Sequence, residues 1–392
     1  MTSENHHIYK VNFITKFNIT PDKFVHFLFT FTILFWFISI NQSELHFLKQ
    51  LANTTFYIQP LLSLKLGKEI QNLPEIIYKS IAIIVVPSGI YYFLNRLFSL
   101  HIGKCWSAIL AFMSISVFDD FSIHQFVIAI IKGVGYNSSY ASSSPAVFQI
   151  PIPGFSTLYF VAAVFFMIKT KSLSQYHILI ASAVLACSFY INAIDSLFLL
   201  VFWFVYMIAK GTRKLKWSPL FTTKYLIISL MVLVFLAFPA LWNSDFVNIV
   251  NKNSNGSYVT FILALVGPVF LMTMFYLSQR IDPMELVARF GYVFALLFAE
   301  LFLVILASTK ILGLDLNILA ARIPQYFLHW LYYVPPIYYL SRSVPDYKFG
   351  IESKGLFKRF RQGVQYVSSN EKFIIAAVAI IVAVYNVLPI LI

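Results

Sequence analysis

Two adjacent carboxylates, Asp119 and Asp120, are the residues of this sequence best suited to catalysis. They follow an apolar run, and His124 comes five residues after Asp119. Two acids side by side in a region of low dielectric repel each other, which raises the pKa of one and gives a group suited to proton abstraction or metal binding. We predict that these three residues are catalytic. The alternative is that the acids only end a helix where it reaches a polar surface.

Glu300 lies in the middle of an apolar run, Phe298-Ala299-Glu300-Leu301-Phe302. A carboxyl group in such a run must face a cavity or a polar partner, or stay protonated. It therefore either relays protons or contacts a polar substrate, or it ties two helices by a hydrogen bond. Asp195 follows Asn192 in a short polar turn, where a catalytic role and a turn-forming role are both open.

Further candidate substrate-binding residues are basic or are histidines. Arg322 precedes an aromatic segment that includes His329, and a guanidinium group matches phosphate oxygens in a bidentate fork. Lys132 follows the acidic pair in the same polar segment. For Arg322 the alternative is an interfacial side chain that only reaches toward water.

Motifs of other activities are absent from the sequence. It contains no Walker loop, dinucleotide fingerprint, His-Glu-x-x-His pattern or nucleophile elbow. Cys105 and Cys187 lie in apolar stretches and give neither metal-ligand spacing nor a disulfide framework. No cofactor is predicted, and a divalent metal at the acidic pair stays an alternative.

The composition is that of a membrane protein. Hydrophobic residues make up 59% of the chain and charged residues 11%, against about 45–50% and 25% in soluble proteins. An interior of this size cannot hold the excess, so part of it must face lipid. The net charge of +13 is spread over short loops, which predicts membrane lipid and not nucleic acid as the partner.

Apolar runs long enough to cross a bilayer recur along the whole chain. We predict one all-α transmembrane domain over 1–392 with about eleven spans. Prolines interrupt several of them: Pro87 in the second span, Pro239 at the end of the seventh and Pro335-Pro336 in the tenth. The fifth and sixth spans are expected to form a helical hairpin. The predicted spans are 24–40, 77–95, 102–118, 154–169, 177–192, 194–209, 224–241, 258–278, 290–308, 325–341 and 373–391.

The loop charges select an orientation. With the N-terminus in the cytoplasm, the inner segments hold 21 of the 29 Lys and Arg residues, as the positive-inside rule requires. The leader 1–23 and the basic loop 342–372 are then cytoplasmic, and the latter is expected to touch anionic lipid headgroups. The long loops 41–76 and 119–153 are outside, the first as amphipathic helices on the outer leaflet. We expect a plasma or inner membrane, or the endoplasmic reticulum of a eukaryote.

This layout resembles the polytopic glycosyltransferases of the GT-C type and other surface-polysaccharide membrane proteins. The resemblance rests on the outer acidic pair, a polar segment closing on Ile150-Pro151-Ile152-Pro153, the run Leu314-Asp315-Leu316-Asn317, and a helix opening at Arg322. It implies a polyprenyl-phosphate-linked sugar donor, a glycan or lipid acceptor, and a catalytic acid on the non-cytoplasmic face. In such enzymes that acid is usually in the first outer loop, which here offers Glu44, Glu69 and Glu75.

Three functions compete on this sequence. A membrane glycosyltransferase predicts a wet cavity that opens outward, with Asp119 or Asp120 at its floor. A transporter or flippase predicts a site at the middle of the membrane that uses Glu300 and the broken helices. A polysaccharide polymerase of the O-antigen type would bring several external arginines, of which only Arg322 is present.

Overall fold

The computed structural model describes residues 20–39, 74–116, 151–169, 175–191, 193–212, 258–279, 283–309, 330–341 and 356–391. All regular elements in these ranges are helical, which confirms the all-α prediction. They are α2 (Pro21–Ser39), α5 (Glu75–Ser80), the π-helix η1 (Ile81–Val85), α6 (Val86–Phe98), α7 (Lys104–Ser116), α11 (Pro151–Lys169), α12 (Gln175–Ile191), α13 (Ala193–Thr212), α16 (Tyr258–Gln279), α17 (Pro283–Thr309), the 3-10 helix η2 (Trp330–Tyr333), α20 (Val334–Ser341), α21 (Leu356–Ser369) and α22 (Glu371–Leu391).

The long helices coincide with predicted apolar segments, except that α21 forms within 342–372, which was predicted as a loop. The predicted segment 224–241 lies outside the described residues. By length and composition, one described helix, α2, could cross a membrane. A second would be added if Gln362–Ser369 and Glu371–Val384, bent by 82°, count as one broken span. The positions of the helices thus agree with the sequence, whereas eleven membrane crossings are not shown.

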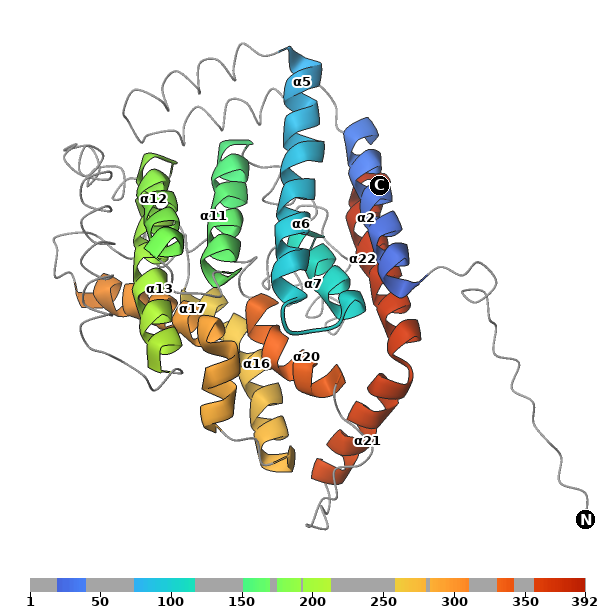
Figure 1. The fold of residues 1–392 in the computed structure, drawn as a ribbon. Coiled ribbons are helices and arrows are strands. Elements are labelled where there is room, and N and C mark those ends of the chain that lie inside the picture. Colours follow the sequence, from blue (N-terminus) through green and yellow to red (C-terminus); the bar gives the residue numbers. More distant parts are fainter. Residues whose placement is uncertain are drawn as a thin grey trace, which may run out of the picture.

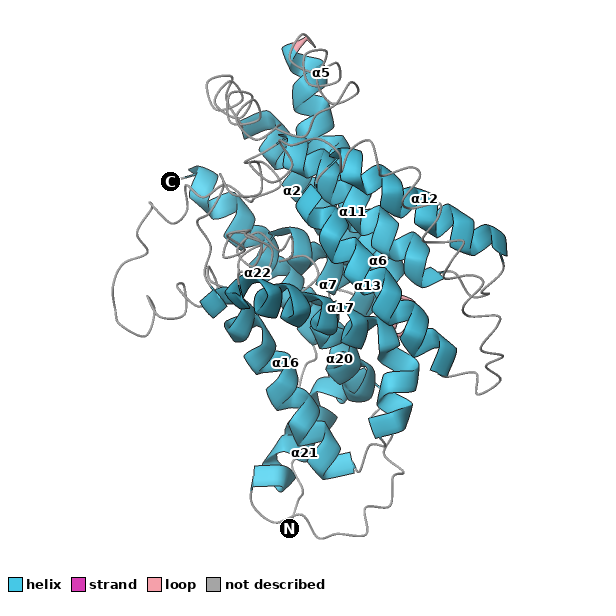
Figure 2. Ribbon diagram, turned by 90° about the vertical axis from the view of Figure 1, so that its left-hand side faces the viewer, coloured by secondary structure: helices cyan, strands magenta, loops and turns pink. Residues whose placement is uncertain are grey.

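The helices form a row with a second group at one end. In Figures 1 and 2, α2, α6, α11, α12, α13 and α22 run alongside one another. The helices α16, α20 and α21 lie together below this row in both views. Tyr333 of η2 approaches α16 at Gly267, where a Cβ atom would lie 2.5 Å from the tyrosine hydroxyl. The missing side chain therefore permits this contact.

The α7 helix packs against α2, α6 and α22 and belongs to the same row. The helices α2, α7 and α22 begin at the same end of this row. Cys105 in α7 lies near Asp22 in α2 and near Glu371 and Lys372 in α22. Fifteen residues further along α22, the Asn386 carbonyl accepts a hydrogen bond of 3.1 Å from the indole of Trp36 in α2. Seven residues beyond Asp22 and Cys105, Phe29 of α2 lies beside Phe112 of α7. The helices α2, α7 and α22 are therefore parallel.

Neighbouring helices run in the opposite direction. His26 and Tyr91 are hydrogen-bonded at 2.5 Å, and Lys79 lies over the ring of Phe37, so the chain of α5 and α6 runs antiparallel to α2.

Contacts along α11 extend this alternation to the rest of the row. Phe165 of α11 lies beside Phe93 of α6, and a Cβ at Gly89 would meet Leu158, so α6 and α11 are parallel. The α11 helix contacts α13 twice at the same offset of 38 residues, through Phe160–Phe198 and through the bond from Tyr206 to the Ile168 carbonyl. These helices are parallel as well.

One end of the row is rich in basic residues. Lys23, Lys104 and Lys372 stand at or near the starts of α2, α7 and α22, and Arg96 stands near the end of α6. We call this the basic end. The α21 helix joins the row there, because it directly precedes α22.

The π-helix η1 adapts the chain to Pro87. A proline has no N–H group, so it leaves a carbonyl of the preceding turn without its usual donor. The chain widens before this point: the N–H of Val86 bonds the carbonyl of Ile81, five residues back. Such widened turns occur mostly as single turns inside α-helices. The predicted interruption of the second span is therefore a widened turn within a continuous helix.

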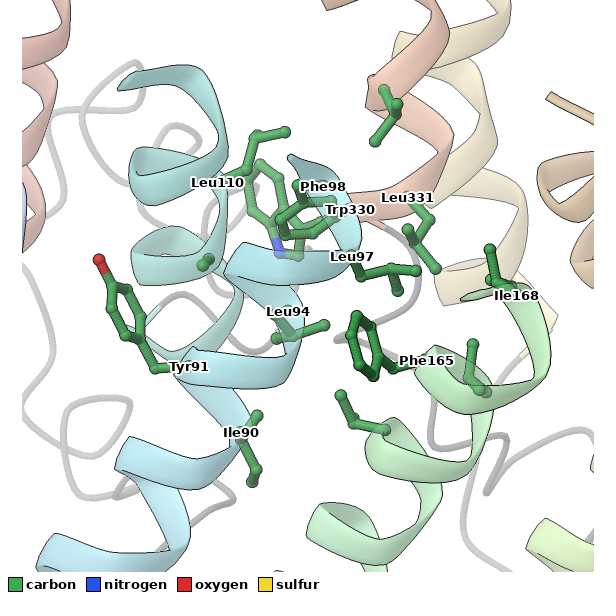
Figure 3. Packing of buried hydrophobic residues seen from close by; sticks show 14 of the residues in the cluster. Ile90, Tyr91, Leu94, Leu97, Phe98, Leu110, Phe165, Ile168, Trp330 and Leu331 are labelled. Atoms are coloured by element: carbon green, nitrogen blue, oxygen red, sulfur yellow. The ribbon is translucent and has the colours of Figure 1, made fainter. Parts of the chain in front are cut away.

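The core of the row is packed with large apolar side chains. Leu94, Leu97 and Phe98 of α6 are fully buried, as is Phe112 of α7. Figure 3 shows this side of α6 facing α11, with Phe165 between the two helices. Gly89 sits on the same helix where α6 and α11 approach each other, and an added Cβ would lie 2.8 Å from a methyl carbon of Leu158.

We predict that Gly89→Leu destabilises the protein, because Leu158 and α11 must move aside for the new side chain. Overpacking of this kind costs about 1–3 kcal/mol. Gly363→Leu in α21 is the matched control, since a Cβ there meets nothing within 4 Å and leucine favours helix. Thermal unfolding of the purified variants measures the difference. Equal stability of the two variants would show that α6 and α11 are not packed as described.

Candidate functional site

Most of the residues predicted for the site lie outside the described part of the chain. This holds for Asp119, Asp120, His124 and Lys132, and also for Arg322 and His329. Two predicted residues, Asp195 and Glu300, belong to described helices. The site that the structure describes is therefore built around Glu300.

Asp195 is the third residue of α13, which begins at Ala193. The prediction placed it in the turn between two helices, but the turn is shorter than expected and the helix has already begun. A carboxylate in the first turn of a helix is favoured, because unpaired N–H groups give that end a partial positive charge. The adjacent helices α12 and α13 agree with the predicted hairpin in having only Asn192 between them.

Glu300 is the one charged residue among the described side chains that is buried, with no exposed surface. It lies on α17 next to Ala299, which is buried as well. The α17 helix packs along α13, so the carboxyl group is enclosed by helices. A charge in such a place is costly unless a polar partner or a proton compensates for the lost hydration.

The partner of Glu300 is Tyr332, whose hydroxyl interacts with the carboxyl group. Tyr332 belongs to η2 and is only 4% exposed. A tyrosine hydroxyl can donate to a carboxylate or accept from a carboxylic acid, so the pair can hold either protonation state of Glu300. The interaction links α17 to η2, and the hydrogen-bonding alternative for Glu300 stays a prediction.

The irregular backbone of η2 follows from the sequence around it. Pro335 and Pro336 stand in the first turn of α20, where their missing N–H groups cost least. They cannot continue a regular helix back through Tyr332, since the preceding carbonyls would lack donors. The chain therefore makes one 3-10 turn, Trp330–Tyr333, before α20. The predicted break in the tenth span is present.

The place of η2 differs from the prediction. The sequence put residues 322–330 at an outer opening of the tenth span, away from the basic end. In the structure Trp330 lies beside Phe98, the last residue of α6, and shares one buried cluster with Leu331, Leu97 and Ile168 (Figure 3). These residues stand where α6 and α11 end. The large apolar surface of Trp330 and Leu331 is covered there, which explains the position.

A second polar tie lies close to the start of α17. The Arg289 guanidinium donates a hydrogen bond to the Tyr338 hydroxyl and lies 4.9 Å from the centre of its ring. Beyond the kink of α17 at Phe290, the ring of Tyr292 stacks on His101, which follows α6. Both contacts join α17 to neighbouring segments at the basic end.

The sequence pointed to Glu300 but not to Tyr332. An acid in an apolar run is a visible signal, whereas Tyr332 is one of 23 tyrosines. The available signal was its place three residues before Pro335-Pro336, in a segment that cannot be regular helix. Among the described residues, no group of three or more His, Cys, Asp or Glu side chains is arranged to hold a metal.

Comparison with known proteins adds no assignment. No family model matches the chain, and no curated protein or solved structure matches it.

We predict that Glu300 and Tyr332 are coupled in stability. Glu300→Leu should cost about 1–3 kcal/mol, since the buried Tyr332 hydroxyl loses its partner. Glu300→Gln should cost less, because an amide keeps the shape and the hydrogen bond. Combining Glu300→Leu with Tyr332→Phe should recover part of the loss, as both polar groups are removed.

Thermal unfolding of the single and double variants tests this coupling, with Tyr366→Phe at an exposed position as the control. If the effects of the two single variants simply add, the residues do not act as a pair.

Proposed function

We propose that this chain is a polytopic membrane protein of about eleven spans, with its N-terminus in the cytoplasm and its C-terminus outside. The main support is apolar surface on the outside of the helices. On α2, Phe27, Phe31, Leu34 and Ile38 form an exposed stripe, each at least half exposed. The opposite face of the same helix is packed in the core. A helix that is apolar all round is typical of a membrane span.

The α22 helix repeats this pattern. Phe373, Ile380, Ile381 and Val384 are exposed along one side, while Ile375, Ala379 and Val382 on the other side are buried. In water such stripes would favour aggregation, whereas in a bilayer they face lipid at no cost. A stripe on both the first and the last helix supports a common lipid-facing side.

The helix directions support the predicted orientation. In the predicted order, α2, α7, α12 and α22 are odd-numbered spans and α6, α11 and α13 are even-numbered. The contacts described above make α2, α7 and α22 parallel and α6 antiparallel to them, with α11 and α13 parallel to α6. The basic end of this row would then face the cytoplasm. The directions of α16 and α20, which lie beside α21 and outside the row, do not support the orientation.

Within that architecture the chain acts as a glycosyltransferase that takes a sugar from a polyprenyl-phosphate carrier on the non-cytoplasmic face. The observation that carries this proposal is the placement of α7. Its residues Ala108, Phe112 and Ile115 are fully buried, and the helix runs away from the basic end to Ser116. Three further residues span at most about 11 Å. On this proposal we expect Asp119 close to the non-cytoplasmic end of α7.

An acid held in this way suits a general base. It would take the proton from an acceptor hydroxyl as that oxygen attacks the sugar carbon, and the lipid phosphate would leave with the electrons of the broken bond. Asp119 or Asp120 supplies the base, with His124 nearby in sequence. Lys132 is the candidate phosphate ligand, and a membrane glycan or lipid is the acceptor. Arg322 is not assigned to this face, because Trp330, eight residues further along the chain, lies at the basic end.

A transporter is the second candidate, and one specific observation favours it. Glu300 is a fully buried acid that interacts with a tyrosine hydroxyl beside a broken helix. Acids in such positions serve as proton relays in pumps and transporters. In that case Glu300→Gln would remove the pH dependence of transport. In the glycosyltransferase it would leave product formation largely intact.

We predict that Asp119→Asn or Asp120→Asn abolishes glycan product while the protein still accumulates in the membrane. Loss of a general base lowers the rate by about a hundredfold to ten-thousandfold, whereas loss of an exposed helix-end acid changes stability by about 0.5 kcal/mol or less. His124→Ala should have a smaller effect. Transfer of labelled sugar from the lipid carrier in isolated membranes is the measurement.

Asp22→Asn, in the first turn of α2 on the proposed cytoplasmic side, is a matched control for these substitutions and should leave transfer unchanged. Normal product from both Asn variants would place the catalytic acid elsewhere. The acids of the first outer loop, Glu44, Glu69 and Glu75, would then become the candidates.

A further inference from the structure

The α21 helix has a basic composition that the proposed chemistry does not use. It carries Lys358, Arg359 and Arg361 and has no acidic residue. Arg359 is exposed, as are Gln362 and Gln365. One side of the helix is covered: Phe360 and Val364 pack with Phe275 of α16 and Tyr339 of α20. The helix therefore uses its apolar side for packing and leaves the Arg359 side chain exposed.

A hydrogen-bonded elbow holds α21 at a large angle to α22. The carbonyl of Tyr366 accepts hydrogen bonds from Ser369 and from the side-chain and backbone N–H groups of Asn370. The carbonyl of Asn370 in turn accepts the N–H of Ile374 at 3.0 Å, within α22. The two helices are bent by 82° at this point. The direction of α21 is thus fixed by the elbow.

The elbow is also attached to the row. The α22 helix, which begins at Glu371, packs against α2 and α7. Two large aromatic side chains flank the elbow and are exposed, Tyr366 at 64% and Phe373 at 69%. Exposed aromatic residues at the end of an apolar helix are typical of the level of lipid headgroups.

We propose that α21 is a binding surface for anionic phospholipid headgroups on the cytoplasmic leaflet. The inference rests on the proposed membrane architecture. If α22 crosses the bilayer, a helix at 82° to it lies nearly in the plane of the surface. Its basic residues then face a layer of negative charge, which attracts each base near the surface and is screened beyond about 8 Å at physiological salt. Charge complementarity favours lipid over a neutral protein surface.

The test uses the full chain with Cys105 and Cys187 replaced by serine, reconstituted into vesicles. A fluorophore is attached to a single cysteine at Gln365 on α21 or at Ile381 on α22. Its quenching is compared between phosphatidylglycerol and phosphatidylcholine. The spin label is on the acyl chain near the headgroup for Gln365 and near the end of the acyl chain for Ile381, which lies about 15 Å along α22 from Glu371. Quenching of this kind acts over short range, so it reports the lipids next to the label.

At Gln365, the apparent affinity of labelled phosphatidylglycerol for the position next to the fluorophore should exceed that of phosphatidylcholine by at least about fivefold. This is the ratio expected if one basic side chain attracts the anionic headgroup by about 1 kcal/mol. The preference should disappear in 1 M salt, where screening acts within about 3 Å. It should also disappear in the triple variant Lys358→Gln/Arg359→Gln/Arg361→Gln. Lys23→Gln/Arg96→Gln/Lys104→Gln, which removes three charges from the same end, should retain it.

The two labels separate the two proposals. Quenching at Ile381 by both lipids, with no preference for phosphatidylglycerol at Gln365, overturns the lipid-binding inference and leaves the membrane architecture intact. It would point to an acidic protein segment as the partner of α21. Absence of quenching at Ile381 overturns the architecture and the inference together.

Discussion

The bond from the Trp36 indole to the Asn386 carbonyl joins helices 350 residues apart in sequence. Both residues are buried, so the N–H group would be costly to leave without an acceptor. The contact holds α2 against α22 far from their starts, and α2, α7 and α22 pack on one another, with Cys105 of α7 near Asp22 and Glu371 at the starts of the other two. Because α2 and α22 are joined at two points along their length, they cannot slide past each other. The described helices between them in sequence must pack against this pair.

Two consequences follow for the candidate site. The first is that α7 has little freedom, because it packs against α2, α6 and α22. Whatever follows Ser116 starts from a fixed point. The second is that the elbow at Asn370 is held on one side, because α22 packs against α2 and α7. The proposed catalytic acids and the proposed lipid-binding helix are therefore attached to the same three helices, at opposite ends.

The sequence predicted where helices lie along the chain better than it predicted which helices pack against each other. Apolar runs gave the helices, and Pro335-Pro336 gave the break between η2 and α20, because both depend on local chemistry. The pairing of Glu300 with Tyr332 and the position of Trp330 beside Phe98 depend on which helices pack together. A helix that is apolar on all sides, such as α2, carries no stripe that would say which face meets protein and which meets lipid. The side chains of 117–150, with Asp119 and Asp120, lie outside the described residues, so that part of the site rests on sequence alone.

The central claim is that α2, α7 and α22 start together on the cytoplasmic face. Single cysteines at Lys23, Lys104 and Lys372, all exposed, test it in a chain without Cys105 and Cys187. A membrane-impermeant thiol reagent should leave all three unlabelled in intact cells and label all three in inverted vesicles. A cysteine at Ile76, exposed at the start of α5, should show the reverse. Labelling of one of the three from outside, with the other two protected, would contradict the parallel arrangement.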